Sequence, residues 1–86
     1  MQFKLNDLLS VRKIENEIFV LNRKTSKLHT FNDSGAILWE ALGTSSNSED
    51  LVRVMCDKYE VDHFSAEKDV AVFLDELCQI NLIEPL

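Results

Sequence analysis

The stretch from Lys27 to Trp39 reads KLHTFNDSGAILW, and within it a strand-like pattern gives way to a helix-like one. The β-branched and aromatic residues of its first part predict a strand at 27–31. The apolar residues of its second part belong to a helix predicted at 33–42, and they cover most of its circumference, so we expect this helix to be central. Between the two lies a polar run that can cap the helix, Asn32-Asp33-Ser34.

Two shorter runs of similar composition precede this stretch and predict strands at 10–14 and 18–22. A turn at Glu15-Asn16 joins the first two strands, and a polar link at 23–26 leads to the third. Links this short make neighbouring strands antiparallel. The first third of the chain is therefore expected to form a three-stranded meander.

Apolar stripes with the 3.6-residue period predict two more helices, at 48–59 and 66–80. Gly43 ends the first helix, and the polar loop 44–48 offers several N-caps to the second. Ser65 is a suitable N-cap for the third. The stripes are Leu51, Val52, Met55, Cys56 and Tyr59 in one helix and Val70, Phe73, Leu74, Leu77 and Ile80 in the other.

Three strands followed by three helices account for the 86 residues, so we expect one domain spanning 1–86. The composition, 45% hydrophobic and 28% charged, is that of a folded globular protein. A small antiparallel sheet must cover its apolar face with helices. We therefore predict an α+β fold of winged helix-turn-helix type, a three-stranded antiparallel sheet followed by three α-helices.

Charge is divided unevenly along the chain. The net charge is −6, yet residues 1–31 carry six basic and three acidic residues, which leaves −9 on the remainder. Affinity for nucleic acid comes from cations that displace counterions from phosphates, so the overall charge disfavours it. A basic lobe on an acidic body indicates a local site for an acidic partner, although exposed Lys and Arg are often only solvated.

The sequence lacks the patterns of several kinds of site. Gly35 and Gly43 are its only glycines, too few for a phosphate-binding loop. Neither His29 nor His63 has a Ser, Cys or carboxylate at a spacing typical of nucleophilic catalysis. No Cys/His spacing matches a zinc site. We therefore expect no catalytic residue, no metal ion and no cofactor.

A winged-helix fold raises the question of DNA binding by the last helix. Residues 66–80 carry four acidic residues and one basic residue, a charge of −3 where a recognition helix would meet phosphates. A winged-helix regulator that binds nucleic acid is therefore an alternative interpretation, as is a structural subunit of a larger complex. The sequence also has no apolar signal core and no run long enough to span a bilayer, so we expect a cytoplasmic protein without a membrane partner.

The strand at 27–31 is an edge of the predicted meander, and an edge offers unpaired N–H and C=O groups to an extended peptide. The period of two places Leu28 and Thr30 on one face and His29 and Phe31 on the other. The alternative is that a charged residue such as Lys27 only protects this edge from pairing with other chains. The sequence thus identifies an edge strand as a candidate docking site for a peptide.

Ordered motifs over 28–82 resemble the PqqD-like family, the peptide-recognition elements of pathways that modify ribosomally made peptides. The first motifs are the strand Leu28-His29-Thr30-Phe31-Asn32 and the helix Ser34-Gly35-Ala36-Ile37-Leu38-Trp39-Glu40-Ala41-Leu42. The later ones are Glu49-Asp50-Leu51, Tyr59, Asp69-Val70, Phe73-Leu74, Leu77 and Asn81-Leu82-Ile83. The chain departs from the pattern in having Phe31 for Leu, Asn81 for Gly, and Leu28-His29 where many lasso-peptide members have two aromatic residues.

This resemblance implies that a leader peptide binds as a fourth strand against 27–31, by β-augmentation, with its apolar side chains in a groove beside the last helix. The leader-peptide-binding residues that it implies are Lys27, Leu28, His29, Thr30 and Phe31 on the strand and Asp69, Val70, Phe73 and Leu77 on the helix. Phe31 and Leu77 belong either to the groove or to the core.

The resemblance also implies a role without catalysis. Such a chaperone presents a precursor peptide to a separate maturation enzyme, which is a radical SAM maturase or a lasso-type leader peptidase and cyclase. The basic lobe suits acidic residues in a leader, mostly by speeding the encounter. We expect the chain itself to be a monomer or a weak homodimer.

Overall fold

The meander is a three-stranded antiparallel sheet with strand order β2-β3-β4, which leaves β2 and β4 as its edges. A computed structural model describes residues 2–44 and 47–86. The strands are β2 (Leu9–Ile14), β3 (Glu17–Asn22) and β4 (Lys27–Phe31). Ile14 and Glu17 are paired across a two-residue turn, and Asn22 is paired with Lys27 across the next link.

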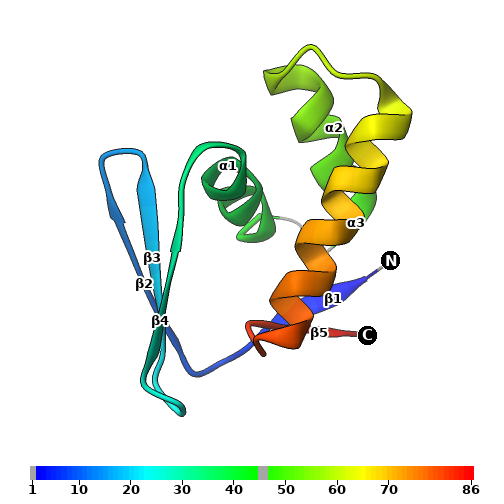
Figure 1. Cartoon of the computed structure of the whole chain (residues 1–86). Helices are drawn as coiled ribbons and strands as arrows, with labels where there is room; N and C mark the ends of the chain where they lie inside the picture. The colour runs from blue at the N-terminus through cyan, green and yellow to red at the C-terminus, as the bar shows by residue number, and fades with distance from the viewer. Residues whose placement is uncertain (1, 45–46) are drawn as a thin grey trace.

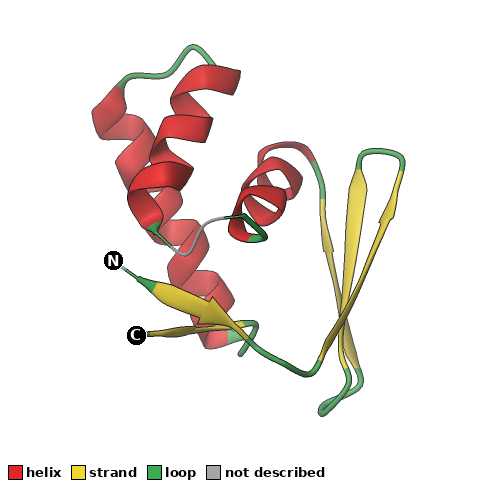
Figure 2. Cartoon of the chain, turned by 180° about the vertical axis from the view of Figure 1, so that it is seen from behind, coloured by secondary structure: helices red, strands yellow, loops and turns green. Residues whose placement is uncertain are grey.

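Three helices follow the sheet, and they form the rest of the core (Figure 1). They are α1 (Asp33–Leu42), α2 (Ser48–Lys58) and α3 (His63–Gln79). Helix α1 packs against β3 and β4, while α2 packs against α1 and α3. Figures 1 and 2 show α1 between the sheet and the α2–α3 pair. This architecture confirms the predicted α+β fold class.

A second, two-stranded sheet joins the two ends of the chain and was not predicted from the sequence. β1 (Phe3–Leu5) and β5 (Ile83–Pro85) are antiparallel, with Leu5 opposite Ile83 (Figure 2). Strands of three residues are too short to show a period of two, so the sequence contains no pattern that predicts them. Phe3 and Ile83 are each 1% exposed, and β5 packs against α3.

Helix α3 is followed by an asparagine, a residue that is common at the left-handed position after a helix. Asn81 has a left-handed backbone, with φ of 62°. The Asn81 N–H donates to the Cys78 carbonyl, and the Leu82 N–H donates to the Leu77 carbonyl at 3.0 Å. This pair of bonds is a Schellman motif, and it directs the chain from α3 into β5.

The helix starts differ in part from the prediction. Asn47 caps α2, its Oδ1 accepting a hydrogen bond from the Glu49 N–H at 2.9 Å. Ser45 and Ser46, also in the predicted capping loop, lie outside the described residues. Helix α3 begins three residues before the predicted start, because Asp62 and not Ser65 is its N-cap.

The Asp62 cap makes the start of α3 sensitive to pH. Its Oδ1 accepts the Ser65 N–H at 2.6 Å. Hydrogen bonding to Ser65 lowers the pKa of this carboxyl below its ordinary value of 3.8, because the bond favours the charged form. A depressed pKa in the folded state means that the stabilisation is present above pH 3.8 and is lost as the pH falls through the folded-state pKa.

Asp62→Ala is expected to lower the melting temperature at pH 7, since the first turn of α3 loses its cap. The difference in melting temperature between the variant and the natural chain should shrink below pH 3.8, because Asp62 then loses its charge in the natural chain. Thermal unfolding followed by circular dichroism from pH 2 to 7 measures both effects. Glu60→Ala, an exposed acid outside the helices, is the control. A difference that stays constant over the whole range would contradict this role of the carboxylate.

The terminal sheet is expected to contribute to stability in proportion to its burial. Phe3→Ala removes a ring that is 1% exposed and should cost about 3 kcal/mol of unfolding free energy. Leu86→Ala, at a side chain that is 75% exposed, should change the unfolding free energy little. Urea denaturation of both variants measures the contrast. Equal stability of the two variants would show that the β1–β5 pairing is not part of the folded core.

Candidate functional site

The free edge of β4 presents the backbone of Leu28 and Thr30. A two-residue hairpin closes on a hydrogen-bonded pair, here Ile14 and Glu17, and such pairs then alternate along the strands. The Arg23 N–H donates to the carbonyl of Leu8, the residue just before β2, at 2.8 Å. This bond is where the alternation predicts the next hydrogen-bonded pair.

The same alternation determines which β4 groups are already paired. The N–H and C=O groups of Ile18 and Val20 are directed towards β4, so their partners Phe31 and His29 are engaged in the ladder. The intervening residues Leu28 and Thr30 direct their N–H and C=O groups away from β3. Because β4 is the last strand of its sheet, these groups are at the free edge.

The side chains of β4 alternate as predicted from the sequence. His29 and Phe31 are half-buried on the face that carries Ile18 and Val20, the buried face towards the helices. Leu28 and Thr30 are exposed on the outer face, with Leu28 60% exposed. An apolar side chain this exposed on an edge strand is available to an added strand.

Phe31 connects β4 to two helices through its ring. The ring stacks on Trp39 of α1, with centroids 5.3 Å apart and planes within 9°. It also meets Phe73 of α3 edge-on, at 5.9 Å and 70°. Since Phe31 and Phe73 are both half-buried, their rings belong to the core and also border the space beside the free edge.

The predicted residues of α3 divide into two groups. Asp69 is exposed and Phe73 is half-buried, on the flank of α3 that meets Phe31. Val70 and Leu77 are each 1% exposed, so their side chains lie in the core and support Phe73 from behind. Ile80 belongs to the predicted apolar stripe of this helix but is 36% exposed. It lies two turns beyond Phe73 on the same flank.

Basic side chains gather at one end of β4. Arg23, Lys24 and Lys27 are all exposed around the turn between β3 and β4. The buried Asn22 holds this turn, because its Oδ1 accepts the Lys24 N–H at 3.0 Å. Lys13 is instead engaged by Glu40 of α1, with Nζ 2.5 Å from Oε1. The positive charge is thus concentrated at the start of β4.

Residues 2–44 and 47–86 contain no group of three or more His, Cys, Asp and Glu side chains that could hold a metal ion. Cys56 and Cys78 are free thiols and are half-buried. Among the described residues, no helix is both long and apolar enough to cross a bilayer.

Comparisons with known proteins identify a family and two similar solved structures. The family model for coenzyme PQQ synthesis protein D, PqqD, matches residues 17–83. No curated protein matches the chain. The solved structure of TbiB1 in complex with the TbiA(beta) leader peptide is similar with a TM-score of 0.90 and 27% identity, over 94% of each chain.

A second solved structure, lasso peptide synthetase B1 complexed with the leader peptide, has a TM-score of 0.87 and 22% identity. The match covers 99% of this chain and 100% of the other. At this identity the likeness concerns the fold. This second match covers nearly the whole chain, so the fold as a whole is one already seen in a peptide-bound protein.

Proposed function

This chain belongs to the PqqD family, and from that membership we propose that it is a non-catalytic peptide chaperone. It binds the leader region of a ribosomally synthesised precursor peptide and presents it to a separate modifying enzyme. It supplies binding energy and position, while the enzyme supplies the chemistry. The chain acts in the cytoplasm as a monomer or a weak homodimer.

The observation that carries the proposal is the free edge of β4 beside an aromatic flank of α3. Leu28 and Thr30 offer backbone groups to an incoming strand, as derived from the strand register. Phe73 lies next to that edge through its contact with Phe31. An extended leader is therefore bound by β-augmentation, with main-chain hydrogen bonds for affinity and side-chain contacts for specificity.

The leader's side chains alternate between the two faces of the extended sheet. Those on the inner face meet Phe31, Phe73 and Ile80, so apolar residues are favoured there. Those on the outer face lie beside Leu28 and Thr30. Val70 and Leu77 take part as buried supports of the α3 flank and do not contact the leader directly.

Charge sets the orientation and the speed of the encounter. Arg23, Lys24 and Lys27 lie at the start of β4, and Asp69 lies on the facing flank of α3. Acidic residues of a leader are favoured near the three bases, and complementary charge mainly raises the association rate. Salt should therefore slow association more than it changes dissociation.

The modifying enzyme is a radical SAM maturase or a lasso-type leader peptidase and cyclase. The second class is favoured by the likeness to two proteins solved with leader peptides, TbiB1 at 27% identity and lasso peptide synthetase B1 at 22%. Enzymes of both classes need the leader to be held in a fixed register, which this protein would provide.

Thr30→Pro tests the pairing directly. The substitution removes an outward N–H and places a ring where the leader would pair, so the affinity for the leader should fall about tenfold or more. The fold should survive, since this N–H is not used in the β3–β4 ladder. Isothermal titration with the leader of the cognate precursor peptide measures the change.

Thr30→Ala is the matched control, because it keeps the N–H and shortens only the side chain. It should bind the leader within about threefold of the natural chain, since it retains the main-chain bonds. A folded Thr30→Pro variant that binds as tightly as Thr30→Ala would exclude pairing at this position.

A further inference from the structure

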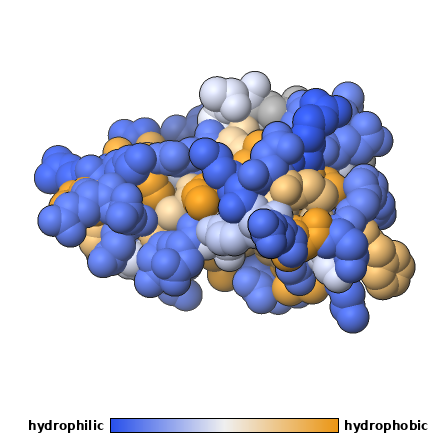
Figure 3. Space-filling model, turned by 90° about the horizontal axis from the view of Figure 1, so that it is seen from above, coloured by the Kyte–Doolittle hydropathy of each residue, from blue (hydrophilic) through white to orange (hydrophobic). Residues whose placement is uncertain are grey.

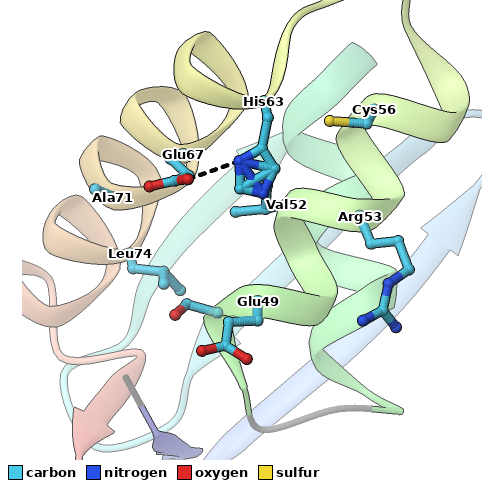
Figure 4. Close-up of a pocket in the computed structure, with 9 residues that line it drawn as sticks. Glu49, Val52, Arg53, Cys56, His63, Glu67, Ala71 and Leu74 are labelled. Atoms are coloured by element: carbon cyan, nitrogen blue, oxygen red, sulfur yellow. Dashed lines mark ion pairs between the residues drawn. The ribbon is translucent and has the colours of Figure 1, made fainter.

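A second surface feature lies on the other side of α3, in a cleft between α2 and α3 (Figure 4). The cleft has a volume of about 700 Å³, in the range of known ligand sites, about 300 to 1,000 Å³. Val52 and Leu74 form its buried apolar part, and the exposed Ala71 lies on its α3 side. Glu49 and Glu67 supply carboxylates from the two helices (Figure 4).

Internal ion pairs engage the basic groups of this cleft. Arg53 Nη1 lies 3.2 Å from Asp50 Oδ1. His63 Nδ1 lies 2.7 Å from Glu67 Oε1, the dashed contact of Figure 4. The helices α2 and α3 together carry seven acidic residues and three basic ones. The two helices thus have a net charge of −4 (three basic minus seven acidic residues), which favours a ligand that brings positive charge as well as apolar groups.

The cleft and the leader edge use opposite flanks of α3. Glu67 and Ala71 each precede by two residues a member of the leader flank, Asp69 and Phe73. At 3.6 residues per turn, two residues are about 200° apart around the helix. A leader bound at β4 would thus leave the cleft open.

An exposed aromatic side chain lies on the flank of α3 that borders the cleft. Phe64 is 79% exposed. It lies seven residues before Ala71, so both are on the same flank of α3. Figure 3 shows apolar side chains exposed among hydrophilic ones over the helical part of the molecule. Exposed aromatic side chains are enriched at protein–protein interfaces, so Phe64 is a candidate anchor for a partner.

We propose that the α2–α3 cleft is the docking site of the modifying enzyme, and that it takes a cationic, amphipathic segment of that enzyme. Apolar side chains of the segment contact the exposed Phe64 and Ala71, above the buried Val52 and Leu74, and its Lys or Arg residues contact Glu49. The inference rests on the proposed function, since it names the surface that meets the enzyme. One chain can then hold leader and enzyme together, which raises the effective concentration of one at the other.

Ala71→Arg is the test, because it places bulk and positive charge in the cleft from an exposed position. Val72→Arg is the matched control, since it adds the same side chain to the same helix at a neighbouring position that is 53% exposed. The probe is the purified enzyme that modifies the precursor whose leader this chain binds. Its affinity is measured by isothermal titration at 50 and 300 mM salt, and leader affinity is measured in parallel.

We expect Ala71→Arg to weaken enzyme binding at least tenfold, and Val72→Arg to change it less than threefold. Higher salt should weaken the enzyme's binding to the natural chain. Both variants should bind the leader as the natural chain does. Enzyme binding that is absent, or equally strong in Ala71→Arg, would overturn the inference while leader binding stands.

Two further outcomes would also overturn it. If Ala71→Arg abolishes self-association in sedimentation but not enzyme binding, the occupant of the cleft is a second copy of this chain. If both substitutions weaken enzyme binding equally, net charge on α3 is responsible and the cleft is not. Failure of the natural chain to bind the leader would instead contradict the proposed function.

Discussion

The ring of Phe31 joins the sheet to the helices, and the position of the candidate site depends on it. Its stacking on Trp39 fixes the end of β4 against α1, and its edge contact with Phe73 fixes the flank of α3 beside β4. Aromatic pairs of this kind contribute about 0.5–1.5 kcal/mol beyond the area that they bury. The contact thus places a free strand edge and an apolar helix flank next to each other, the two parts that an extended peptide needs.

Helix α3 borders both proposed binding surfaces because of its length and its period. One side of it supports the core through Val70, Leu74 and Leu77, each 1% exposed. The two flanks beside that buried side meet different surroundings, β4 on one and α2 on the other. A single helix therefore separates a peptide edge from the cleft without any hinge or second domain.

Much of this arrangement could be predicted from the sequence, because it rests on local periodicity. The alternation at Leu28 and His29, the meander and the left-handed Asn81 all follow from patterns a few residues long. The β1–β5 pairing brings together the two ends of the chain, and no local pattern encodes such a contact. The apolar stripe of α3 likewise could not tell the buried Leu77 from the exposed Ile80, since only packing decides which end of a stripe is covered.

Amide hydrogen exchange on the β-sheet tests the central claim most directly. The Leu28 and Thr30 amides should exchange readily in the free chain and become protected when the leader is added, because the leader supplies their missing acceptors. The Val11 and Lys13 amides, which by the same alternation are directed outwards at the opposite edge β2, serve as the internal comparison. Protection of Leu28 and Thr30 alone is the predicted result. Protection at Val11 and Lys13 instead, or at neither edge, would contradict leader binding on β4.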